Sequence, residues 1–482
     1  MGEPRFVIIG AGMAGILSAI KLREAGHRDV AVYEKADRLG GTWRENTYPG
    51  IACDVPSHLY SYSFAPNPDW SSVFSSGTEI CAYFDAVAHR FEVAAGVHYG
   101  VEVTGLTFTD GRWRVTTTAG EDVADVVIAA TGVLHHPAYP DIEGLDSFAG
   151  PVFHSARWDH DVDLDGCRLG LIGTGSSAVQ IVSATADTVG ELHLFQRTAQ
   201  WVMPVPNPPI DEVDRARFRA EPAAMRQVRD NLAEMFETQF ANAVVNADSP
   251  QMQMLAEACR ANLEDHVADP VLREKLRPSY RAACKRLVIS PDFYDKVQRP
   301  GVSVVTEAIT GVEPGGVRTA DGQLHELDVL VLATGFRVDR FLRPIEVVGR
   351  DGVGLDTVWA KRPSAYLSIS IPQFPNLFML NGPNGPVGNF SLIDVAELQF
   401  GYIAQLVHVI ADGGRQVSPT TEALERFEAA RVEAAKKTVW VTGCRSWYLD
   451  DRGIPSAWPW GFDRFRAEMA APDLTHYDVV NA

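Results

Sequence analysis

Two glycine-rich turns are the parts of this sequence best suited to hold a reactive cofactor. They lie in RFVIIGAGMAG at residues 5–15 and in RLGLIGTGSSA at residues 168–178, and each follows a short apolar run and precedes a helical pattern. Glycines in such a turn let backbone amides approach a pyrophosphate at a helix N-terminus, where unpaired N–H groups favour negative charge. Ala178 takes the third glycine's place in the second turn, where only a small residue is needed. The turn residues expected to bind two dinucleotides are Gly10, Gly12, Gly15, Gly173, Thr174, Gly175, Ser176 and Ser177.

The end of the next strand indicates which nucleotide each turn prefers. Glu34 and Arg197 stand there, at the same distance from the first glycine of their turns. A carboxylate accepts hydrogen bonds from ribose hydroxyls and repels a 2′-phosphate, so Glu34 indicates FAD or NAD. An arginine can bind the 2′-phosphate with a charge-assisted fork, so Arg197, followed by Thr198, indicates NADPH. One unit of each kind predicts FAD and NADPH on a single chain, with a hydride passing from NADPH to the flavin.

Cysteine spacing limits what the reduced flavin does next. The six cysteines are scattered over 482 residues, and none stands in a CxxC or CxxxxC pair. This spacing predicts neither a disulfide framework nor a zinc or other metal site. It also excludes electron transfer to a cysteine pair beside the flavin, which leaves an external acceptor or dioxygen.

The bulk composition is that of an ordinary globular chain with a surplus of negative charge. Hydrophobic residues make up 46% of the chain and the formal net charge is −19, so a phosphate backbone or an anionic bilayer would be repelled. No apolar run reaches the ~18 residues that span a bilayer, and the N-terminal sequence shows no signal peptide. We expect a cytoplasmic protein without nucleic-acid or membrane partners, and the oligomeric state stays open.

A second repeat and a change in composition organise the rest of the chain. VVIAATG at 126–132 and VLVLATG at 329–335 are buried-strand runs that each close one nucleotide-binding unit. No glycine occurs between Glu191 and Pro300, and apolar residues at helical spacing predict a helical insertion over 212–285. The closing motifs add four residues expected near the cofactors, namely Thr131, Gly132, Thr334 and Gly335.

Two longer segments resemble a known family. GGTWRENTYPGIACDVPSHLYSYSF at 40–64 and FAGPVFHSARWD at 148–159 are similar to the type I, or class B, Baeyer–Villiger monooxygenases. The resemblance runs over nearly the whole chain, ends with GCRSWYLDDRGIPSAWPW at 443–460 and is weakest in the helical insertion. The family fingerprint FxGxxxHxxxW(P/D) is matched by Phe148, Gly150, His154, Trp158 and Asp159. Related flavin-containing monooxygenases usually carry Tyr or Phe at the position of Trp158.

The repeats and the resemblance together predict an α/β fold with two Rossmann-like dinucleotide-binding domains, a discontinuous FAD domain and a helical insertion. We expect the fingerprint histidine, His154, to have a structural and conformational role rather than a catalytic one. The expected boundaries are 1–145 and 325–482 for the FAD-binding domain, 160–211 and 286–324 for the NADP-binding domain, 212–285 for the insertion and 146–159 for an interdomain linker.

The resemblance implies a flavin-dependent monooxygenase that converts a ketone to an ester or lactone. Reduced flavin would react with dioxygen to give a C4a-peroxyflavin, which attacks the carbonyl of a small-molecule ketone. The attacking peroxide and the developing oxyanion both need a fixed, permanent cation, and arginine keeps its proton. By resemblance, Arg286 is this cation and Asp54 orients it, while Lys285 lies near the NADPH 2′-phosphate.

The same resemblance places further residues at the flavin. The loop NGPNGPVGNFS at 381–391 is expected to give backbone amides to the flavin ring or to line the substrate pocket. Its composition departs from that of phenyl-ketone and cyclohexanone enzymes, which leaves the substrate open. Tyr48 is expected to pack round the flavin with two other aromatic residues. The remaining flavin-side residues are Gly41, Thr42, Trp43, Asp54 and Tyr60.

Two other functions stay open. A flavin-containing monooxygenase would oxygenate sulfur or amine nitrogen through the protonated hydroperoxyflavin, and Arg286 and Trp158 are the residues that discriminate it from a ketone-oxidising enzyme. A non-catalytic flavin protein would sense redox state or pair with a partner. Two intact dinucleotide sites and filled active-site positions argue against this last alternative.

Overall fold

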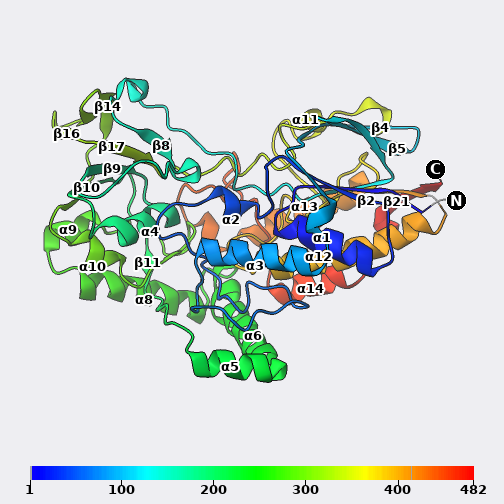
Figure 1. Cartoon of the computed structure of the whole chain (residues 1–482), viewed down its shortest axis with the longest axis horizontal. Coiled ribbons are helices and arrows are strands. Elements are labelled where there is room, and N and C mark those ends of the chain that lie inside the picture. The colour runs from blue at the N-terminus through cyan, green and yellow to red at the C-terminus, as the bar shows by residue number, and fades with distance from the viewer. Residues whose placement is uncertain (1–2, 414, 482) are drawn as a thin grey trace.

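Apolar runs of the sequence form the strands of two parallel sheets, one in each lobe of the molecule (Figure 1). In this computed structural model, which describes residues 3–413 and 415–481, the first sheet has the strand order β19-β7-β1-β2-β3. Neighbouring strands all run parallel. The strands are β1 (Phe6–Ile9), β2 (Val30–Glu34), β3 (Val97–Tyr99), β7 (Val126–Ala129) and β19 (Leu377–Met379).

Strand β1 is buried on both faces, which explains its uninterrupted apolar sequence. Phe6 and Ile8 pack against helices on one face, whereas Val7 and Ile9 pack against a second, mostly antiparallel sheet on the other. The first lobe is therefore a three-layer structure with the glycine turn after β1 at its centre. The second sheet has the order β18-β4-β5-β6, with β4 (Val103–Thr109), β5 (Arg112–Thr117), β6 (Gly120–Ala124) and β18 (Glu346–Val348).

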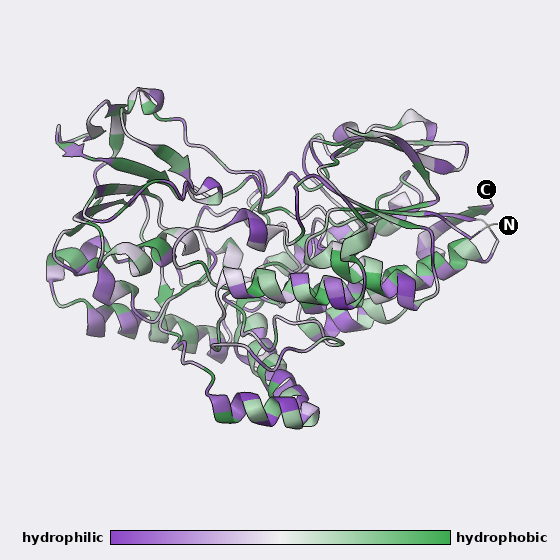
Figure 2. Cartoon of the chain, in the orientation of Figure 1, coloured by the Kyte–Doolittle hydropathy of each residue, from purple (hydrophilic) through white to green (hydrophobic). Residues whose placement is uncertain are grey.

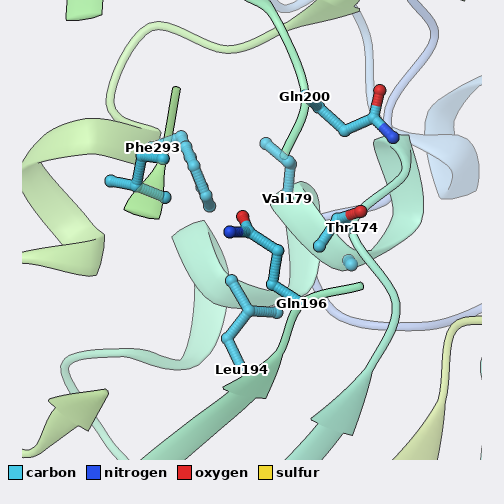
Figure 3. A pocket seen from close by; sticks show the side chains of 8 residues that line it. Thr174, Val179, Leu194, Gln196, Gln200 and Phe293 are labelled. Carbon is cyan, nitrogen blue, oxygen red and sulfur yellow. The ribbon is translucent and has the colours of Figure 1, made fainter. Parts of the chain in front are cut away.

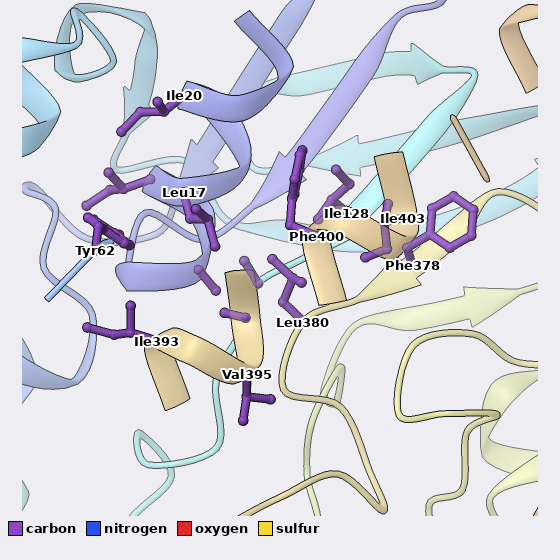
Figure 4. Packing of buried hydrophobic residues seen from close by; sticks show 14 of the residues in the cluster. Leu17, Ile20, Tyr62, Ile128, Phe378, Leu380, Ile393, Val395, Phe400 and Ile403 are labelled. Atoms are coloured by element: carbon purple, nitrogen blue, oxygen red, sulfur yellow. The ribbon is translucent and has the colours of Figure 1, made fainter. Parts of the chain in front are cut away.

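Helices α1 and α12 form the third layer of this lobe (Figure 4). Leu17 of α1 and Phe400 and Ile403 of α12 point into one core, and both helices are apolar over most of their length (Figure 2). Among the described residues, no helix combines the length and the apolar character needed to cross a bilayer. Helix α1 spans Met13–Glu24 and α12 spans Leu392–Ala411. The other elements of this lobe are α2 (Thr42–Glu45), α3 (Gly77–Arg90), α11 (Leu355–Val358), α13 (Thr421–Ala435), α14 (Phe462–Ala470), β20 (Arg415–Pro419) and β21 (Tyr477–Asn481).

The second lobe contains a second βαβ unit, built on a parallel sheet with the strand order β13-β10-β9-β17-β8. A small antiparallel sheet, β14-β15-β16, and a two-stranded sheet, β11-β12, belong to the same lobe (Figure 1). Its elements are β8 (Val152–His154), β9 (Arg168–Ile172), α4 (Ser176–Thr185), β10 (Glu191–Phe195), β11 (Val202–Met203), β12 (Val288–Ile289), α10 (Phe293–Val297), β13 (Val302–Val305), β14 (Ile309–Glu313), β15 (Gly316–Thr319), β16 (Leu324–Glu326) and β17 (Val329–Leu332).

Two of the expected domain boundaries are wrong. Strand β17 pairs with β9, and β16 belongs to the small sheet beside it, so the first lobe resumes after β17 and not at residue 325. Strand β8, which ends at the fingerprint histidine, pairs with β17, so the segment 146–159 contributes an edge strand to the second lobe. An apolar run in the sequence indicates a strand, but only the folded chain shows which sheet that strand joins.

The glycine-free insertion is helical and contacts both lobes. Phe218 of α5 packs edge-on against His58, with ring centroids 5.0 Å apart, and Arg229 of α6 pairs with Asp394 at the start of α12. Leu263 of α8 lies instead in the core of the second lobe. The insertion therefore spans the junction between the two lobes. Its helices are α5 (Glu212–Ala220), α6 (Pro222–Phe236), a π-helical turn (Glu237–Ala241), α7 (Asn242–Val244), α8 (Pro250–His266) and α9 (Pro270–Lys275).

A disulfide joins Cys284 to Cys444, which are 160 residues apart. The other four cysteines are free. The cysteine spacing, which predicts no disulfide framework, gave no signal for this pair, because a single long-range cross-link leaves no spacing pattern and depends on the fold to bring its two Cβ atoms together. The cross-link ties the end of the insertion to the C-terminal segment.

We expect Gly15→Ala to destabilise the first lobe, because a Cβ at residue 15 would overlap the carbonyl oxygen of Gly10. The overlap should cost more than about 2 kcal/mol. Gly401→Ala is the matched control, since residue 401 lies within α12 with open space round its Cβ, and alanine in a helix is favoured over glycine by about 1 kcal/mol. Thermal unfolding should show a lower melting temperature for the first variant and a higher one for the second. Equal melting temperatures would contradict the close approach.

Candidate functional site

The first glycine turn leaves a helix end ready for an anion. Helix α1 begins at Met13, and its N-cap, Gly12, has no side chain to cap the first amides. The backbones of Gly12 and Gly41 lie close together, since a Cβ at Gly12 would be 3.4 Å from the Cα of Gly41. Gly10 has φ +100°, and Thr42 begins α2 directly after Gly41. The first-turn amides of α1 are therefore placed to bind a pyrophosphate.

Glu34 lies at the end of β2 beside this turn and is buried. Its carboxylate accepts hydrogen bonds from the N–H groups of Ala11 (2.7 Å) and Ala36 (3.0 Å) and pairs with Arg44 (3.1 Å). Burial opposes the charge of Arg44, but the carboxylates of Glu34 and Glu45 raise the pKa of its guanidinium. Sequence reasoning missed Arg44, whose one signal is its place in the GGTWRENTYPG segment. The carboxylate expected to bind ribose is thus fixed by turn backbone and by a buried cation.

The second glycine turn has the same construction. Gly173 has φ +128°, and α4 begins at Ser176 with Gly175 as its N-cap. A Cβ at Gly175 would meet no atom within 4 Å, so this side of the turn faces space that a ligand can fill. The Thr174 hydroxyl donates to the Thr198 carbonyl at 2.7 Å, which fixes the turn to the end of β10.

Two cations lie beside the second turn. Arg197 is exposed and Lys285 is half-buried, and among the described residues neither is in an ion pair. Burial and the nearby charge of Arg197 lower the pKa of Lys285. Two like charges held together fit a dianionic 2′-phosphate, which would neutralise both. The preceding residue, Gln196, points inward (Figure 3), and its Nε2 donates to the Lys275 carbonyl at 2.6 Å, whereas Arg197 is exposed.

Arg286 and Asp54 form an ion pair although they are 232 residues apart in the sequence. The Arg286 Nε donates to Oδ2 of Asp54 at 3.1 Å, and Nη2 donates to the same oxygen. Burial opposes the charge, but the Asp54 carboxylate and the Tyr448 hydroxyl raise the pKa of Arg286 above its usual range. The guanidinium therefore stays charged, and 31% of its side chain remains accessible to a ligand.

The loop at 381–391 reaches the same guanidinium. A Cβ at Gly388 would lie 2.9 Å from Nη1 of Arg286 and would overlap the Tyr448 hydroxyl. The next residue, Asn389, is 1% exposed, and neither polar atom of its amide has a hydrogen-bond partner among the described residues. Leaving such a buried group unsatisfied costs roughly 1–3 kcal/mol, so Asn389 fits a site at which a cofactor or substrate completes the hydrogen bonds.

The aromatic residues separate into two groups. Trp43 Nε1 donates to the Tyr60 hydroxyl at 3.2 Å, and the two rings meet edge-on. Tyr48, expected beside them, lies instead where the lobes meet: its hydroxyl donates to Gln180 at 2.8 Å and accepts from Ser177 at 3.0 Å. Burial raises the pKa of Tyr48 to about 12, so it remains a phenol. Tyr48 thus ties α4 to the loop that leads to Asp54.

The threonines of the two closing motifs are used within the protein. The hydroxyl of Thr131 donates to the Phe341 carbonyl at 3.1 Å, and that of Thr334 donates to the Ala138 carbonyl at 2.6 Å. The glycine that follows each threonine has a positive φ, +65° and +85°. The two threonine hydroxyls are thus already hydrogen-bonded within the protein. The backbone of these motifs, rather than the hydroxyls, is available to contact a cofactor.

His154 is enclosed at the end of β8. Its Nδ1 accepts a hydrogen bond from the Ala156 N–H at 3.0 Å, and its ring packs against Tyr139 and Phe336 with centroids 5.5 and 5.9 Å away. Burial lowers the pKa of His154 to about 4, so the ring is neutral at pH 7. This geometry is that of a packed side chain which supports the junction between the lobes.

Known proteins resemble the chain over its full length. Residues 7–253 match the family described as pyridine nucleotide-disulphide oxidoreductase. The chain is 47% identical over 478 residues to an uncharacterized monooxygenase of Mycobacterium tuberculosis, with 99% of this chain and 96% of that protein covered. It is 40% identical over 482 residues to a Baeyer–Villiger monooxygenase of Streptomyces coelicolor, with 99% and 92% covered.

A solved structure is also similar to this chain over its full length. The crystal structure of cyclohexanone monooxygenase from Rhodococcus sp. Phi1 bound to NADP⁺ superposes with a TM-score of 0.89 at 29% identity, and covers 99% of both chains. The likeness therefore includes both glycine turns and the helical insertion.

His154 should make the stability of the protein depend on pH. Because its pKa is about 4 in the folded chain and 6.5 when free, unfolding takes up a proton in this window, and stability falls as the pH falls through it. His154→Gln keeps an acceptor for the Ala156 N–H but does not titrate. Between pH 7 and pH 5.5 we expect the unchanged protein to lose about 1 kcal/mol more than this variant, measured by denaturant unfolding. Parallel curves would show that folding does not lower the pKa of His154.

Proposed function

The chain belongs to the Baeyer–Villiger monooxygenases, and we propose that it oxidises a ketone to an ester or lactone. One atom of O₂ is inserted next to the carbonyl through a C4a-peroxyflavin, with NADPH as the hydride donor. The observation that carries this proposal is the Arg286–Asp54 ion pair, with the Tyr448 hydroxyl at the same guanidinium.

FAD and NADPH are the cofactors that the two lobes fit. The first lobe offers the open end of α1 and the buried Glu34 for FAD, and the second offers the space at Gly175 with Arg197 and Lys285 for NADPH. Bound flavin supplies the electron transfer and oxygen activation that side chains lack. The other reactants are a small-molecule ketone and O₂. NADPH is available in the cytoplasm, and the proposal places the enzyme there.

Arg286 has the properties that ketone oxygenation demands. Asp54 holds one edge of its guanidinium, and Nη1 faces the loop at Gly388. A cation held in place before the reaction stabilises an attacking anion and a developing oxyanion without reorganising. Because arginine keeps its proton, it does not convert a nucleophilic peroxide anion into its neutral form.

The NADPH lobe is mechanically connected to this ion pair. Gln180 of α4 donates from Nε2 to the Ala52 carbonyl at 3.0 Å, and a Cβ at Gly50 would lie 2.5 Å from the Gln180 carbonyl oxygen. Together with Tyr48, these contacts hold α4 against the segment that ends in Asp54. A shift of the NADPH lobe therefore moves Asp54, which connects hydride delivery to closure of the oxygenation site against water.

The proposal is tested with purified protein, NADPH and a panel of linear, cyclic, aryl and steroid ketones, by oxygen uptake and product mass. Arg286→Ala should reduce the flavin at the normal rate but lose ester and lactone formation by at least about 100-fold. Arg286→Lys is the matched control: it keeps the charge, loses the fork and should retain part of the activity.

Three results would contradict the proposal. Full ketone oxidation by Arg286→Ala would remove this residue from the chemistry. Sulfoxides or N-oxides without any ester or lactone would identify a heteroatom-oxygenating enzyme. Absence of NADPH-dependent flavin bleaching would identify a flavin protein without catalytic function.

Arg197→Ala should weaken NADPH far more than NADH. Loss of a charge-assisted bond to phosphate costs about 1.5–3 kcal/mol, which corresponds to a rise of roughly 10- to 100-fold in KM for NADPH. Arg318→Ala, which removes a half-buried arginine paired with Glu313 on the small sheet, is the control and should leave both KM values unchanged. An equal loss for NADPH and NADH would show that Arg197 does not contact the 2′-phosphate.

A further inference from the structure

The Cys284–Cys444 disulfide joins two segments that each carry a group of the candidate site. Arg286 follows Cys284 by two residues, and Tyr448 follows Cys444 by four. Cys284 is completely buried and Cys444 is 7% exposed, and Ala283, next to Cys284 in the chain, belongs to a buried cluster with Trp440 and Tyr448. The cross-link therefore joins the two segments close to Arg286 and Tyr448.

Tyr448 holds the side of the guanidinium that Asp54 does not hold. Its hydroxyl lies near Nη1 of Arg286, since a Cβ at Gly388 would be 1.9 Å from the hydroxyl and 2.9 Å from Nη1. Because a guanidinium only donates, the phenol oxygen is the group that can accept from it. Gly388 makes this contact possible, since a side chain there would overlap the Tyr448 hydroxyl. Burial raises the pKa of Tyr448, so the hydroxyl stays neutral. Arg286 is thus fixed from two sides by residues from distant parts of the chain.

The segment that carries Tyr448 has little regular structure of its own. Residues 442–447 form neither helix nor strand, and most of them are exposed, including Arg445 and Trp447. Trp447 and Trp440 pack against Tyr448 with tilted rings, at centroid distances of 4.1 and 5.3 Å, and the Ser456 N–H donates to the Tyr448 carbonyl at 2.6 Å. The disulfide anchors the segment at Cys444. Without the disulfide, residues 442–447 lose their covalent link to the segment that carries Arg286.

We propose that Tyr448 is a positioning residue for Arg286 and that the Cys284–Cys444 disulfide keeps it in place, so that opening the disulfide lowers the fraction of NADPH used for oxygenation. The activity readout rests on the proposed function. When Arg286 is poorly fixed, oxygen is still consumed but is released as hydrogen peroxide instead of entering the ketone.

The redox step needs a dithiol as reductant. One thiolate of the dithiol attacks the Cys444 sulfur, whose neighbours in the chain are exposed, and Cys284 leaves as a thiolate that takes up a proton. The second thiol of the reductant then closes its own disulfide and releases Cys444 as a thiol. Two electrons and two protons pass to the enzyme. In a cytoplasm rich in such dithiols, a disulfide is a reversible feature rather than a permanent one.

The first experiment removes the hydroxyl group of Tyr448. Tyr448→Phe should reduce the flavin at the normal rate, lower ester or lactone formation about 10-fold and release the missing oxygen as peroxide. Tyr294→Phe is the matched control, because the hydroxyl of this buried tyrosine has no hydrogen-bond partner among the described residues. Unchanged coupling in Tyr448→Phe, with the melting temperature also unchanged, would overturn the positioning role.

The second experiment opens the disulfide in the holoenzyme with dithiothreitol. Peptide mass mapping establishes whether Cys284 and Cys444 are linked before treatment and separate afterwards. Trypsin should then cut after Arg445 at least about 10-fold faster, because the exposed segment is released. Peroxide release should rise to the level of the Cys284→Ser/Cys444→Ser double variant, and dithiothreitol should have no further effect on that variant. Cys167→Ser, which removes a free cysteine, is the control.

Several outcomes decide against the proposal. Two separate thiols in the untreated protein, or unchanged proteolysis and coupling after reduction, would overturn it. Reduction of the disulfide by NADPH under anaerobic conditions would make the pair an electron acceptor of the flavin rather than a support for Arg286. If no ketone is oxidised under any condition, the proposed function fails, whereas the mass mapping and the proteolysis still decide whether the disulfide holds the segment.

Discussion

The ion pair between Arg286 and Asp54 is the constraint on which the rest of the site depends. A charge taken from water is stable only if a partner at close range replaces its hydration, and removing one partner of such a pair is expensive. Both members must therefore arrive together, from a loop of the first lobe and from the end of the helical insertion. The contacts of Tyr48 and Gln180 with the Asp54 loop, and of Tyr448 with the guanidinium, serve this requirement.

Local arrangement outweighs the net charge of −19. Three cations, Arg197, Lys285 and Arg286, stand where a phosphate and a developing oxyanion are expected, and the first two lack a carboxylate partner among the described residues. Burial and the neighbouring charge of Arg197 both disfavour the charged form of Lys285 and lower its pKa. A bound anion relieves this repulsion. The net negative charge of the chain does not weaken this small anion site, because screening confines each field to about 10 Å at 0.1 M salt.

The sequence predicts those features that follow from local geometry. The two glycine turns and the positions of Glu34 and Arg197 follow from the regular rise of strands and helices, so one distance in the sequence locates both residues. Arg286 has no such signal in CKRL and is found only through the resemblance to a family. Partners set by the tertiary fold escape sequence reasoning altogether: β17 joins the second sheet, Arg44 binds Glu34, and Cys284 reaches Cys444. Tyr448 lies in a segment that the resemblance covers. Only the structure shows that its hydroxyl can approach the guanidinium because Gly388 has no side chain there.

A guanidinium held by several supports changes how substitutions there must be interpreted. Asp54, Tyr448 and the disulfide all act through the position of one side chain, so the free-energy effects of their loss overlap and do not add. Each support also lies in a different part of the chain, which means that a folding defect and a positioning defect have different signatures. Loss of folding lowers flavin reduction and oxygenation together, because both cofactor turns belong to the same structure. Under the proposed function, loss of position should leave the hydride step intact and divert oxygen to peroxide, because Arg286 would act only after the flavin has been reduced. The ratio of ester to peroxide is therefore the quantity that reports on this ion pair, whereas the overall rate of NADPH consumption does not.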